Sequence, residues 1–302
     1  MQQWKLSEIN EALERDAAGF AVAAEQRYTD QVMAIAMQIR DVREERPFIL
    51  LSGPSGSGKT TTALRIESLL DDWGLETITI SLDNYFLPHD AGALPVDEEG
   101  KPDFESPDRL DIPLLQRDLQ KVLECKPVDL PRFDFSTQTR VKGDRLARKP
   151  GELLLIEGIH TLNPHVMGKY LDVTTDVYVS VEDEVVLEDE TVVSRGKLRL
   201  LRRLVRDRLF RGSDVEKTLE RYLSVGRGEK RNILPYAANA MERVNTFLPY
   251  EVGVFGGLLA DVADQLPEEL AALVRAVRPV EAQISPVNSL VREICGGSIY
   301  SY

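Results

Sequence analysis

The sequence has 302 residues, and its 50 Asp and Glu residues outnumber its 37 Lys and Arg residues, which gives a formal net charge of −13. This balance argues against proteins that coat nucleic acids or bind membrane surfaces, because both need a positive field toward an anionic partner. A hydrophobic content of 43% is ordinary for a globular chain, and the length allows one or two domains with a proper core.

The first 45 residues have apolar positions at helical spacing, with Ser7 as the candidate N-cap, and Pro47 ends this segment. Residues 48–51 are all apolar, which is typical of a strand buried on both faces. A glycine-rich turn follows at once, and we expect a helix at 60–70. The expected order is therefore a helix, a strand, a tight turn and a second helix.

Four further strands are expected at 77–82, 153–156, 176–181 and 251–255. A helix is expected at 111–124, where the apolar positions follow helical spacing. The stretch 87–111 is rich in Pro, Asp and Gly and is expected to be a long functional loop. Strands that alternate with helices predict a parallel sheet with helices on both faces.

The strongest motif is Gly-Pro-Ser-Gly-Ser-Gly-Lys-Thr at 53–60, which matches G-x-x-x-x-G-K-[ST] between a strand and a helix. Glycines let several backbone N–H groups point at one phosphate, and the helix adds its positive N-terminal end. Lys59 supplies charge for the β/γ-phosphates, and the Thr60 hydroxyl is placed to bind Mg²⁺. An ordinary glycine-rich turn is the less favoured alternative. The predicted triphosphate-binding residues are Gly53, Ser55, Gly56, Ser57, Gly58, Lys59, Thr60 and Thr61.

Two carboxylates narrow the range of reactions that the bound triphosphate is expected to undergo. Asp83 and Glu157 each end an apolar strand, so both are expected at the carboxyl edge of the sheet, beside the phosphate-binding loop. A kinase needs an acid near Mg²⁺ and a base that accepts the proton of the attacking hydroxyl. A solvated strand end or a helix cap is the alternative for either residue. A GTPase is not favoured, because no Asp-x-x-Gly string follows a strand and no guanine-reading motif is present.

The positive charge is concentrated between Arg195 and Arg231, where 13 Lys and Arg residues stand against 5 Asp and Glu residues. The local charge is +8, which leaves −21 for the rest of the chain. One face of the expected helix carries Leu198, Leu201, Val205 and Leu209, and another carries Arg199, Arg202, Arg203 and Arg206. The arginines close over a transferring phosphate, or they form a solvated face with pairs such as Arg203–Asp207. The pattern alone leaves both interpretations open.

Histidine and cysteine patterns indicate no further chemistry. His89, His160 and His165 lack metal-ligand spacing, and His160 is expected to be a buried histidine with satisfied hydrogen bonds. Two cysteines are too few for a disulfide framework, which favours a reducing, cytoplasmic compartment. No apolar run approaches the ~18 residues of a membrane span, and charges interrupt the apolar stretches that a signal peptide would need.

Several blocks in order resemble the uridine kinase and phosphoribulokinase family of P-loop kinases, from about residue 48 to about residue 255. Besides the phosphate-binding loop, they are SLDNYF at 81–86, FESPD at 104–108, LPRFDF at 130–135, IEGI at 156–159, and RRLVRD at 202–207 with Arg211-Gly212. The chain looks most like the kinase half of bacterial uridine kinase-like proteins that carry a threonyl-tRNA synthetase-like N-terminal part. That likeness rests on IHTLNP at 159–164, SVGRGE at 224–229 and GGS at 296–298. Here that N-terminal part is expected to be missing, with only its connecting helices left before Pro47.

The resemblance implies a P-loop NTPase three-layer α/β fold with a mostly parallel five-stranded sheet, a helical lid and an N-terminal helical extension. It also implies ATP and Mg²⁺ as cofactors. The expected division is a helical extension at 1–46, a kinase domain at 47–280 and a tail at 281–302 that packs on the kinase domain. Asp83 matches the catalytic base, and Glu157 matches a carboxylate that holds Mg²⁺. Arg206 and Arg211 match lid arginines that reach the ATP phosphates, and Arg203 matches an arginine near the acceptor.

The departures from the family pattern fall on the acceptor side. Uridine kinases have an Asp where this chain has Glu105, a Tyr at Phe133, a His at Gln138, a Gln at Arg221 and an Arg at Ser213. Gln138 still offers a donor and an acceptor to a base, whereas the extra cation of Arg221 suits an anionic acceptor. The acceptor-binding residues implied by the resemblance are Asp83, Glu105, Phe133, Gln138, Arg203 and Arg221.

The leading hypothesis is an ATP- and Mg²⁺-dependent kinase that phosphorylates a small-molecule hydroxyl, most simply the 5′-hydroxyl of a nucleoside. The first alternative, motivated by Arg221, is a kinase of a sugar or sugar phosphate. The second is a nucleotide-binding regulatory protein without turnover. Each would act without a nucleic-acid or membrane partner, and the sequence is compatible with a homo-oligomer.

Overall fold

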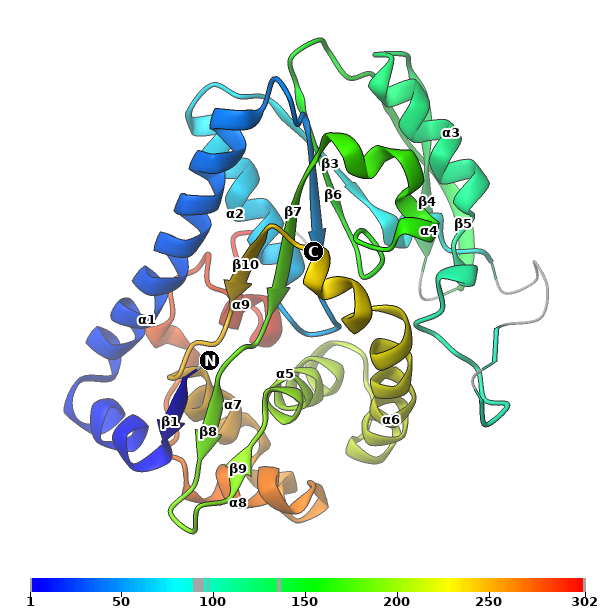
Figure 1. The fold of residues 1–302 in the computed structure, drawn as a ribbon. Helices are drawn as coiled ribbons and strands as arrows, with labels where there is room; N and C mark the ends of the chain where they lie inside the picture. The colour runs from blue at the N-terminus through cyan, green and yellow to red at the C-terminus, as the bar shows by residue number, and fades with distance from the viewer. Residues whose placement is uncertain (1, 89–94, 97, 135–136, 301–302) are drawn as a thin grey trace.

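A five-stranded parallel sheet forms the centre of the chain in a computed structural model that describes residues 2–88, 95–96, 98–134 and 137–300 (Figure 1). The strands lie in the order β10–β7–β2–β6–β3. Their bounds are β2 Phe48–Ser52, β3 Thr77–Ser81, β6 Leu153–Glu157, β7 Thr174–Ser180 and β10 Glu242–Asn245. This arrangement confirms the predicted α/β fold with a five-stranded parallel sheet.

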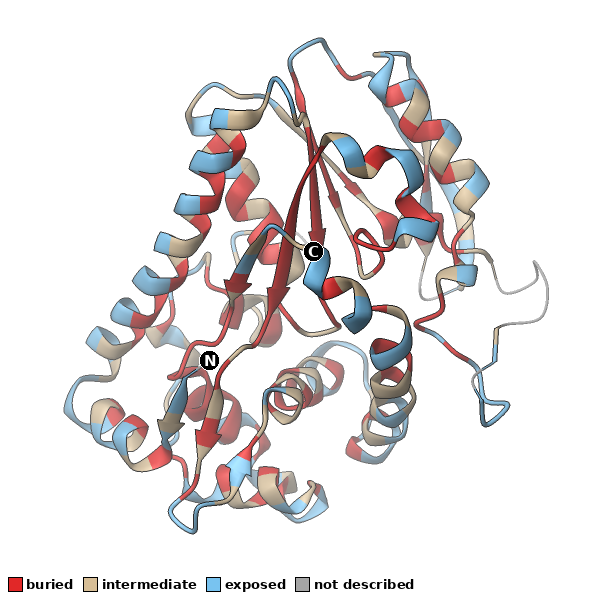
Figure 2. Ribbon diagram, viewed as in Figure 1, coloured by how far each residue is buried: buried red, intermediate tan, exposed pale blue. Residues whose placement is uncertain are grey.

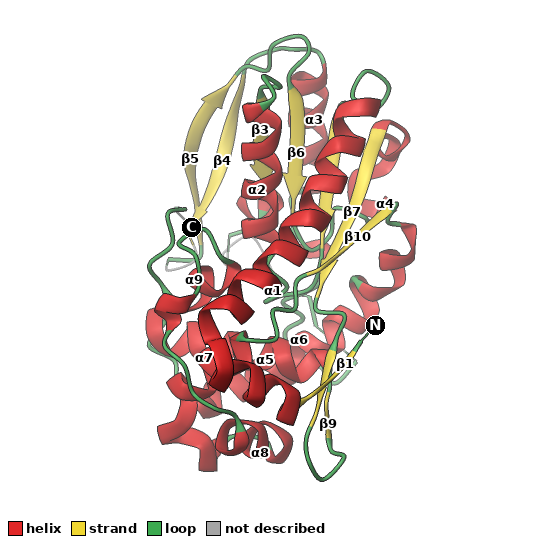
Figure 3. Cartoon of the chain, turned by 90° about the vertical axis from the view of Figure 1, so that its left-hand side faces the viewer, coloured by secondary structure: helices red, strands yellow, loops and turns green. Residues whose placement is uncertain are grey.

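Successive residues of the central strands enter opposite cores, as the alternation of side chains in a strand requires. Ile49 and Leu51 of β2 pack in one hydrophobic cluster with α1 (Leu6–Val42) and α2 (Lys59–Asp72). Phe48 and Leu50 pack in a second cluster with α3 (Ile112–Leu123) on the other face. Figure 2 shows the central strands almost wholly buried, and Figure 3 shows α1 and α2 together along one side of the sheet.

Helices also gather beyond the carboxyl edge of the sheet, toward which the strand arrows point in Figure 1. They are α5 Arg195–Phe210, α6 Val215–Asn232, α7 Glu251–Leu259, α8 Glu268–Ala276 and α9 Leu290–Cys295, whereas the short α4 (Pro164–Met167) belongs to the second cluster. Two smaller groups of strands lie outside the central sheet. One is a hairpin of β4 Val128–Asp134 and β5 Thr139–Leu146, and the other is a small sheet of β1 Gln3–Lys5, β8 Glu184–Val186 and β9 Val192–Val193. In the part of the chain that the structure describes, no helix has the length and apolar character of a membrane span.

The expected fifth strand at 251–255 is wrong. This apolar run begins the helix α7, which is buried against α8 and the core. A continuous apolar run does not distinguish a buried helix from a buried strand, which explains the error. The fifth strand is instead β10 Glu242–Asn245, a short and partly polar edge strand that pairs with β7.

The start of α1 also differs from the prediction. Residues 3–5 form β1, and α1 begins at Leu6 with Lys5 at the N-cap position, so Ser7 is not the cap. The helix breaks at Asp16, with φ −163° and ψ 83°, and the Asp16 carboxylate accepts a hydrogen bond from Gly19 N at 2.9 Å. Asp16 therefore performs the capping role for the second part of α1. His89, Phe135 and part of the expected loop at 87–111 lie outside the described residues.

Candidate active site

The phosphate-binding loop connects β2 to α2 and has the backbone shape that its glycines permit. Gly56 and Gly58 have φ values of 74° and 86°, a region that side-chain-bearing residues rarely adopt. A Cβ atom on Gly53 would lie 2.0 Å from the backbone oxygen of Val179, so only glycine fits there. The first N–H groups of α2 lack helical partners by geometry and face the loop. The loop is therefore shaped for an anion.

Two side chains of the loop are compatible with a bound triphosphate. The Lys59 Nζ donates to the backbone oxygen of Pro54 at 3.3 Å, so its ammonium lies across the loop. Ser57 is fully buried, and its Oγ has no hydrogen-bond partner within the described residues. An unpartnered buried hydroxyl is costly unless a ligand or water completes its bonding. Thr61 differs in that its hydroxyl donates to the Glu293 carboxylate of α9.

Asp83 and Glu157 lie at the same edge of the sheet, at the ends of the neighbouring strands β3 and β6. Glu157 ends β6 and is paired in register with Ser81, whose Oγ donates to the Glu157 Oε1 at 2.5 Å; Asp83 follows Ser81 by two residues. Burial raises the pKa of Asp83 to about 6, and the charge of Glu157 adds to this shift, whereas Lys59 and Arg109 oppose it. A carboxylate with a pKa near 6 is largely ionised at neutral pH and is still basic enough to accept a proton.

Glu105 lies in the same electrostatic cluster, held by a close approach between a loop and α6. Its side chain is 8% exposed, and no partner for its Oε2 is found among the described residues. Burial raises the pKa of Glu105 to about 7, and Glu229 adds to the shift, whereas Lys59 and Arg203 oppose it. A Cβ atom on Gly228 would lie 2.5 Å from the Cβ of Glu105, so the glycine lets α6 approach this loop.

His160 is a member of the site that the sequence reasoning missed. It is 1% exposed, as expected, and hydrogen bonding with the backbone of Asn232 and Glu105 favours its charged form, although neither ring nitrogen has a partner of good geometry among the described residues. Burial lowers the pKa of His160 to about 4, so the ring is neutral at pH 7 and offers one donor and one acceptor. Nearby, the Asn232 Nδ2 donates to the backbone oxygen of Glu105 at 3.0 Å. The position of His160, three residues after Glu157, was the available signal.

An aromatic wall stands beside these polar groups and carries a cation that was also missed. Phe133 is buried and packs edge-to-face on Phe86, with ring centroids 5.8 Å apart. The Arg109 guanidinium lies over Phe86 at 4.9 Å and over Phe104 at 5.3 Å from the ring centroids. Its charge acts on Asp83, and the charges of Glu105 and Asp83 act on it. The structure thus places a cation near Asp83 and Glu105.

Two other predicted acceptor residues lie in the β4–β5 hairpin and on α6. Gln138 lies in the turn of the β4–β5 hairpin with a φ of 55°, and its side chain is half-buried. Arg221 is exposed on α6, and no carboxylate of the described residues lies within ion-pair distance of it.

The arginine face of α5 is divided between two tasks. Arg199 donates to the backbone oxygen of Ser55 at 3.1 Å, and Arg202 donates to that of Gly56 at 3.2 Å, so both hold the phosphate-binding loop from outside. Each is neutralised by a carboxylate, Arg199 by Glu229 at 2.7 Å and Arg202 by Glu251 at 2.8 Å. These two arginines are structural supports of the loop.

The remaining arginines surround Asp207, which is fully buried. Arg203, Arg206 and Arg211 lie 3.4, 3.5 and 3.3 Å from its carboxylate oxygens. Burial, together with the nearby charge of Arg211, lowers the pKa of Arg206. Three guanidinium groups share one carboxylate, so this cluster retains positive charge for an anion.

Known proteins of one kinase family resemble this chain in sequence. The sequence model of the Phosphoribulokinase / Uridine kinase family matches residues 48–245. This chain belongs to that family. The uridine kinase of Lactobacillus helveticus is 31% identical over 180 residues, which cover 59% of this chain and 76% of that protein. The uridine kinase of Geobacillus kaustophilus is 30% identical over 184 residues, which cover 61% and 78%.

Solved structures give a more distant match. The phosphoribulokinase from Rhodobacter spheroides has a TM-score of 0.43 and 17% identity, over 65% of this chain and 68% of that chain. Family membership makes the chain an ATP-dependent kinase, and the family implies ATP, usually with Mg²⁺.

The residues present fit both groups. The unpartnered Ser57 Oγ and the glycine backbone of the loop suit a triphosphate. The described residues contain no cluster of three or more His, Cys, Asp or Glu side chains arranged to hold a metal. Proteins bind Mg²⁺ through one or two carboxylates together with substrate phosphates and water, so a Mg²⁺ site does not require such a cluster. Asp83, Glu157 and the Thr60 hydroxyl are the groups available for it.

Proposed function

We propose that this kinase transfers the γ-phosphoryl group of ATP to the 5′-hydroxyl of a nucleoside. The observation that carries the proposal is the pair of Asp83 and Glu157 beside the phosphate-binding loop, with the Asp83 pKa raised to about 6. The second support is Glu105, a buried carboxylate with an unpartnered oxygen that suits the paired hydroxyls of a ribose. The curated relatives named above are uridine kinases.

In this proposal each residue has a defined task. The loop amides and Lys59 hold the triphosphate, and Thr60 with Glu157 and Asp83 binds the metal. Bound Mg²⁺ neutralises the charge that develops on the phosphates. Asp83 accepts the proton of the attacking hydroxyl, and Arg206 and Arg211 close over the phosphates. Glu105, Phe133 and Gln138 contact the acceptor together with Arg203, and we assign Arg221 at most an outer contact because it is exposed.

One observation favours a second candidate, a kinase of a sugar phosphate. Arg109 places a guanidinium between two aromatic rings, next to the carboxylates Asp83 and Glu105. A guanidinium matches a phosphate by two parallel hydrogen bonds, so an anionic acceptor would use a cation that a neutral nucleoside does not need.

Turnover on a panel of uridine, cytidine and several phosphosugars, measured as ADP release, separates the candidates. We expect ADP release with uridine or cytidine. Turnover on a sugar phosphate alone would replace the first proposal by the second. ATP binding without turnover on any acceptor would favour the regulatory alternative.

The assignment of the base has its own test. The Asp83→Asn variant should lose at least about 100-fold in kcat, because a positioned general base contributes that much or more. Asp72, exposed at the end of α2, provides the matched Asp→Asn control and should retain full activity. An Asp83→Asn protein with most of its turnover would contradict the role of Asp83.

A further inference from the structure

We propose that Glu25, in α1, is a positioning residue for the phosphate-binding loop. Glu25 lies outside the residues that the family model matches, 48–245. Its side chain is 5% exposed, so the carboxylate is removed from water. A buried carboxylate needs strong partners, and those that Glu25 has belong to three other parts of the chain.

The partners of Glu25 connect α1 to α2, which follows the phosphate-binding loop, and to the residues just before α7 and α9. Its Oε2 accepts from the Arg65 Nη2 of α2 at 3.0 Å, as a buried ion pair. Its Oε1 accepts from the Tyr250 hydroxyl at 2.7 Å and from the Ser289 hydroxyl just before α9. One carboxylate therefore joins α1, α2, the residue before α7 and the residue before α9.

Arg65 extends this connection along the helix that follows the loop. It is 8% exposed, and its Nε and Nη2 donate to the backbone oxygen of Asn288 at 3.2 and 2.9 Å. Its Nη1 donates to the Thr29 hydroxyl at 3.1 Å, and the guanidinium lies 4.7 Å from the ring centroid of Tyr28. The orientation of Arg65 is thus set by α1 and by the chain leading into α9.

A second chain of hydrogen bonds reaches the loop itself. The Tyr28 hydroxyl lies 2.7 Å from the Thr62 Oγ1, which donates to the backbone oxygen of Gly58 at 2.8 Å. Because the one hydroxyl proton of Thr62 is used for Gly58, Tyr28 must be the donor to Thr62. Burial raises the pKa of Tyr28, so this donor stays protonated. The last glycine of the loop is therefore held from α1 through two hydroxyl groups.

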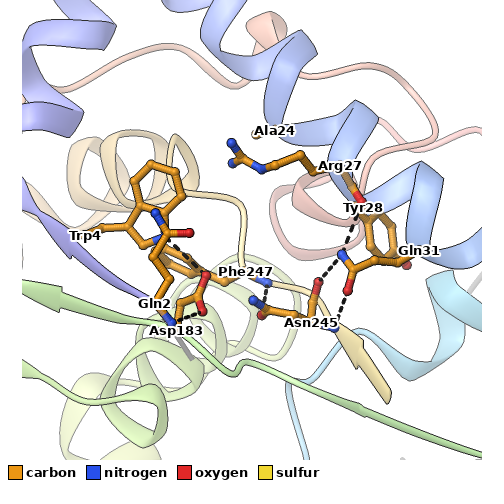
Figure 4. A pocket seen from close by; sticks show the side chains of 9 residues that line it. All are labelled: Gln2, Trp4, Ala24, Arg27, Tyr28, Gln31, Asp183, Asn245 and Phe247. Carbon is orange, nitrogen blue, oxygen red and sulfur yellow. Dashed lines mark hydrogen bonds between the residues drawn. The ribbon is translucent and has the colours of Figure 1, made fainter. Parts of the chain in front are cut away.

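The remaining contacts fix α1 against the sheet and α9 against the loop. The Gln31 amide accepts from the backbone N of Asn245 at 3.0 Å and donates to its backbone oxygen at 3.2 Å, at the edge strand β10 (Figure 4). A Cβ atom on Gly58 would lie 2.0 Å from the Leu290 Cδ1 of α9, so α9 packs directly on the loop. The loop is therefore clamped between α1 and α9, with Glu25 joining the two.

Removal of the Glu25 charge should weaken nucleotide binding in a protein that stays folded. Gln at position 25 keeps the size of the side chain but leaves the buried Arg65 without its counter-charge, so Arg65 and the loop can shift. We expect the Kd of Mg²⁺–ADP, measured by titration calorimetry, to rise about tenfold in Glu25→Gln, as for loss of one charge-assisted hydrogen bond. Glu25→Asp keeps the charge and should restore the Kd to within about threefold of wild type.

Two further variants make the test decisive. Glu11→Gln removes the same charge from an exposed position of α1 and should leave the Kd unchanged. Tyr28→Phe removes only the hydroxyl that reaches Thr62, and the Kd should rise about threefold, as for loss of one neutral hydrogen bond. Wild-type affinity in Glu25→Gln, or in Tyr28→Phe should Glu25→Gln not fold, would overturn the proposal. ADP binding is measured without an acceptor, so this result does not depend on which acceptor the kinase uses.

Discussion

At the scale of single residues, the site combines carboxylates whose pKa values are raised with one histidine whose pKa is lowered. All three shifts have burial as their largest cause. Asp83 and Glu105 therefore titrate close to neutral pH, whereas His160 stays neutral. The protonation of the carboxylates should thus control activity on the acid side of the pH profile.

If Asp83 is the base, kcat/KM should rise with pH through about 6 and reach a plateau above it, because only the ionised form accepts a proton.

The Asp83 carboxyl binds its proton more tightly in the folded than in the unfolded chain. Its contribution to stability is therefore greatest at low pH and is lost as the pH rises through about 6. Asp83→Asn should then melt at a higher temperature than wild type at pH 8 and gain little at pH 4. Equal gains at both pH values would contradict the raised pKa.

Much of the phosphate side could be predicted from single residues, and much of the acceptor side could not. Gly53, Lys59 and Thr60 belong to a contiguous motif, so their neighbourhood is local in the sequence. Arg109 and His160 acquire their surroundings from contacts between distant segments, which no spacing rule reveals. The need for glycine at position 228 likewise depends on the Glu105 loop, more than one hundred residues away.

At the scale of elements, α5 shows one helix face serving both structure and binding. Arg199 and Arg202 donate to loop carbonyls, whereas Arg203, Arg206 and Arg211 gather around Asp207. The helix was predictable from its period, and Leu198, Leu201 and Val205 of the expected apolar stripe are buried, whereas the fourth member, Leu209, is 46% exposed and is a correction to the prediction. The division of the arginines between these two roles could not be predicted, because it depends on the contact between α5 and the phosphate-binding loop. Similarly, β10 is short and polar because it is an edge strand, and only its pairing with β7 identifies it.

Two arginines near the C-terminal end of α5 offer a matched pair of variants. If Arg206 closes over the phosphates, Arg206→Gln should lower kcat at least about 100-fold, because arginines at a transferring phosphate contribute that much or more. Arg208, one position beyond the buried Asp207, pairs with the exposed Asp261 at 2.5 Å. Arg208→Gln should leave kcat within about twofold, since exposed pairs contribute little. Similar losses in both variants would mean that the charge of the helix as a whole matters, and not a contact of Arg206.

At the scale of the whole molecule, the basic segment from Arg195 to Arg231 largely balances carboxylates of the same chain. The three arginines around Asp207 are one example. The other pairs are Arg195 with Glu182, Lys197 with Glu269, Arg199 with Glu229, Arg202 with Glu251, Arg208 with Asp261, Lys217 with Asp214, Arg227 with Glu99 and Arg231 with Asp103. Among the described residues, most of the cations behind the local charge of +8 are therefore paired with carboxylates of the same chain.

This distribution predicts how ATP binding responds to salt. The surface as a whole is acidic, so a long-range field does not draw ATP in, and the cations near the phosphates are partly buried. Short-range, partly buried contacts are screened weakly, so the KM for ATP should change less than about threefold between roughly 50 and 300 mM sodium chloride. Free Mg²⁺ is held constant in the assay, because chloride and ionic strength alter its binding to ATP. A rise in KM of more than about tenfold would mean that exposed positive charge attracts the nucleotide from a distance.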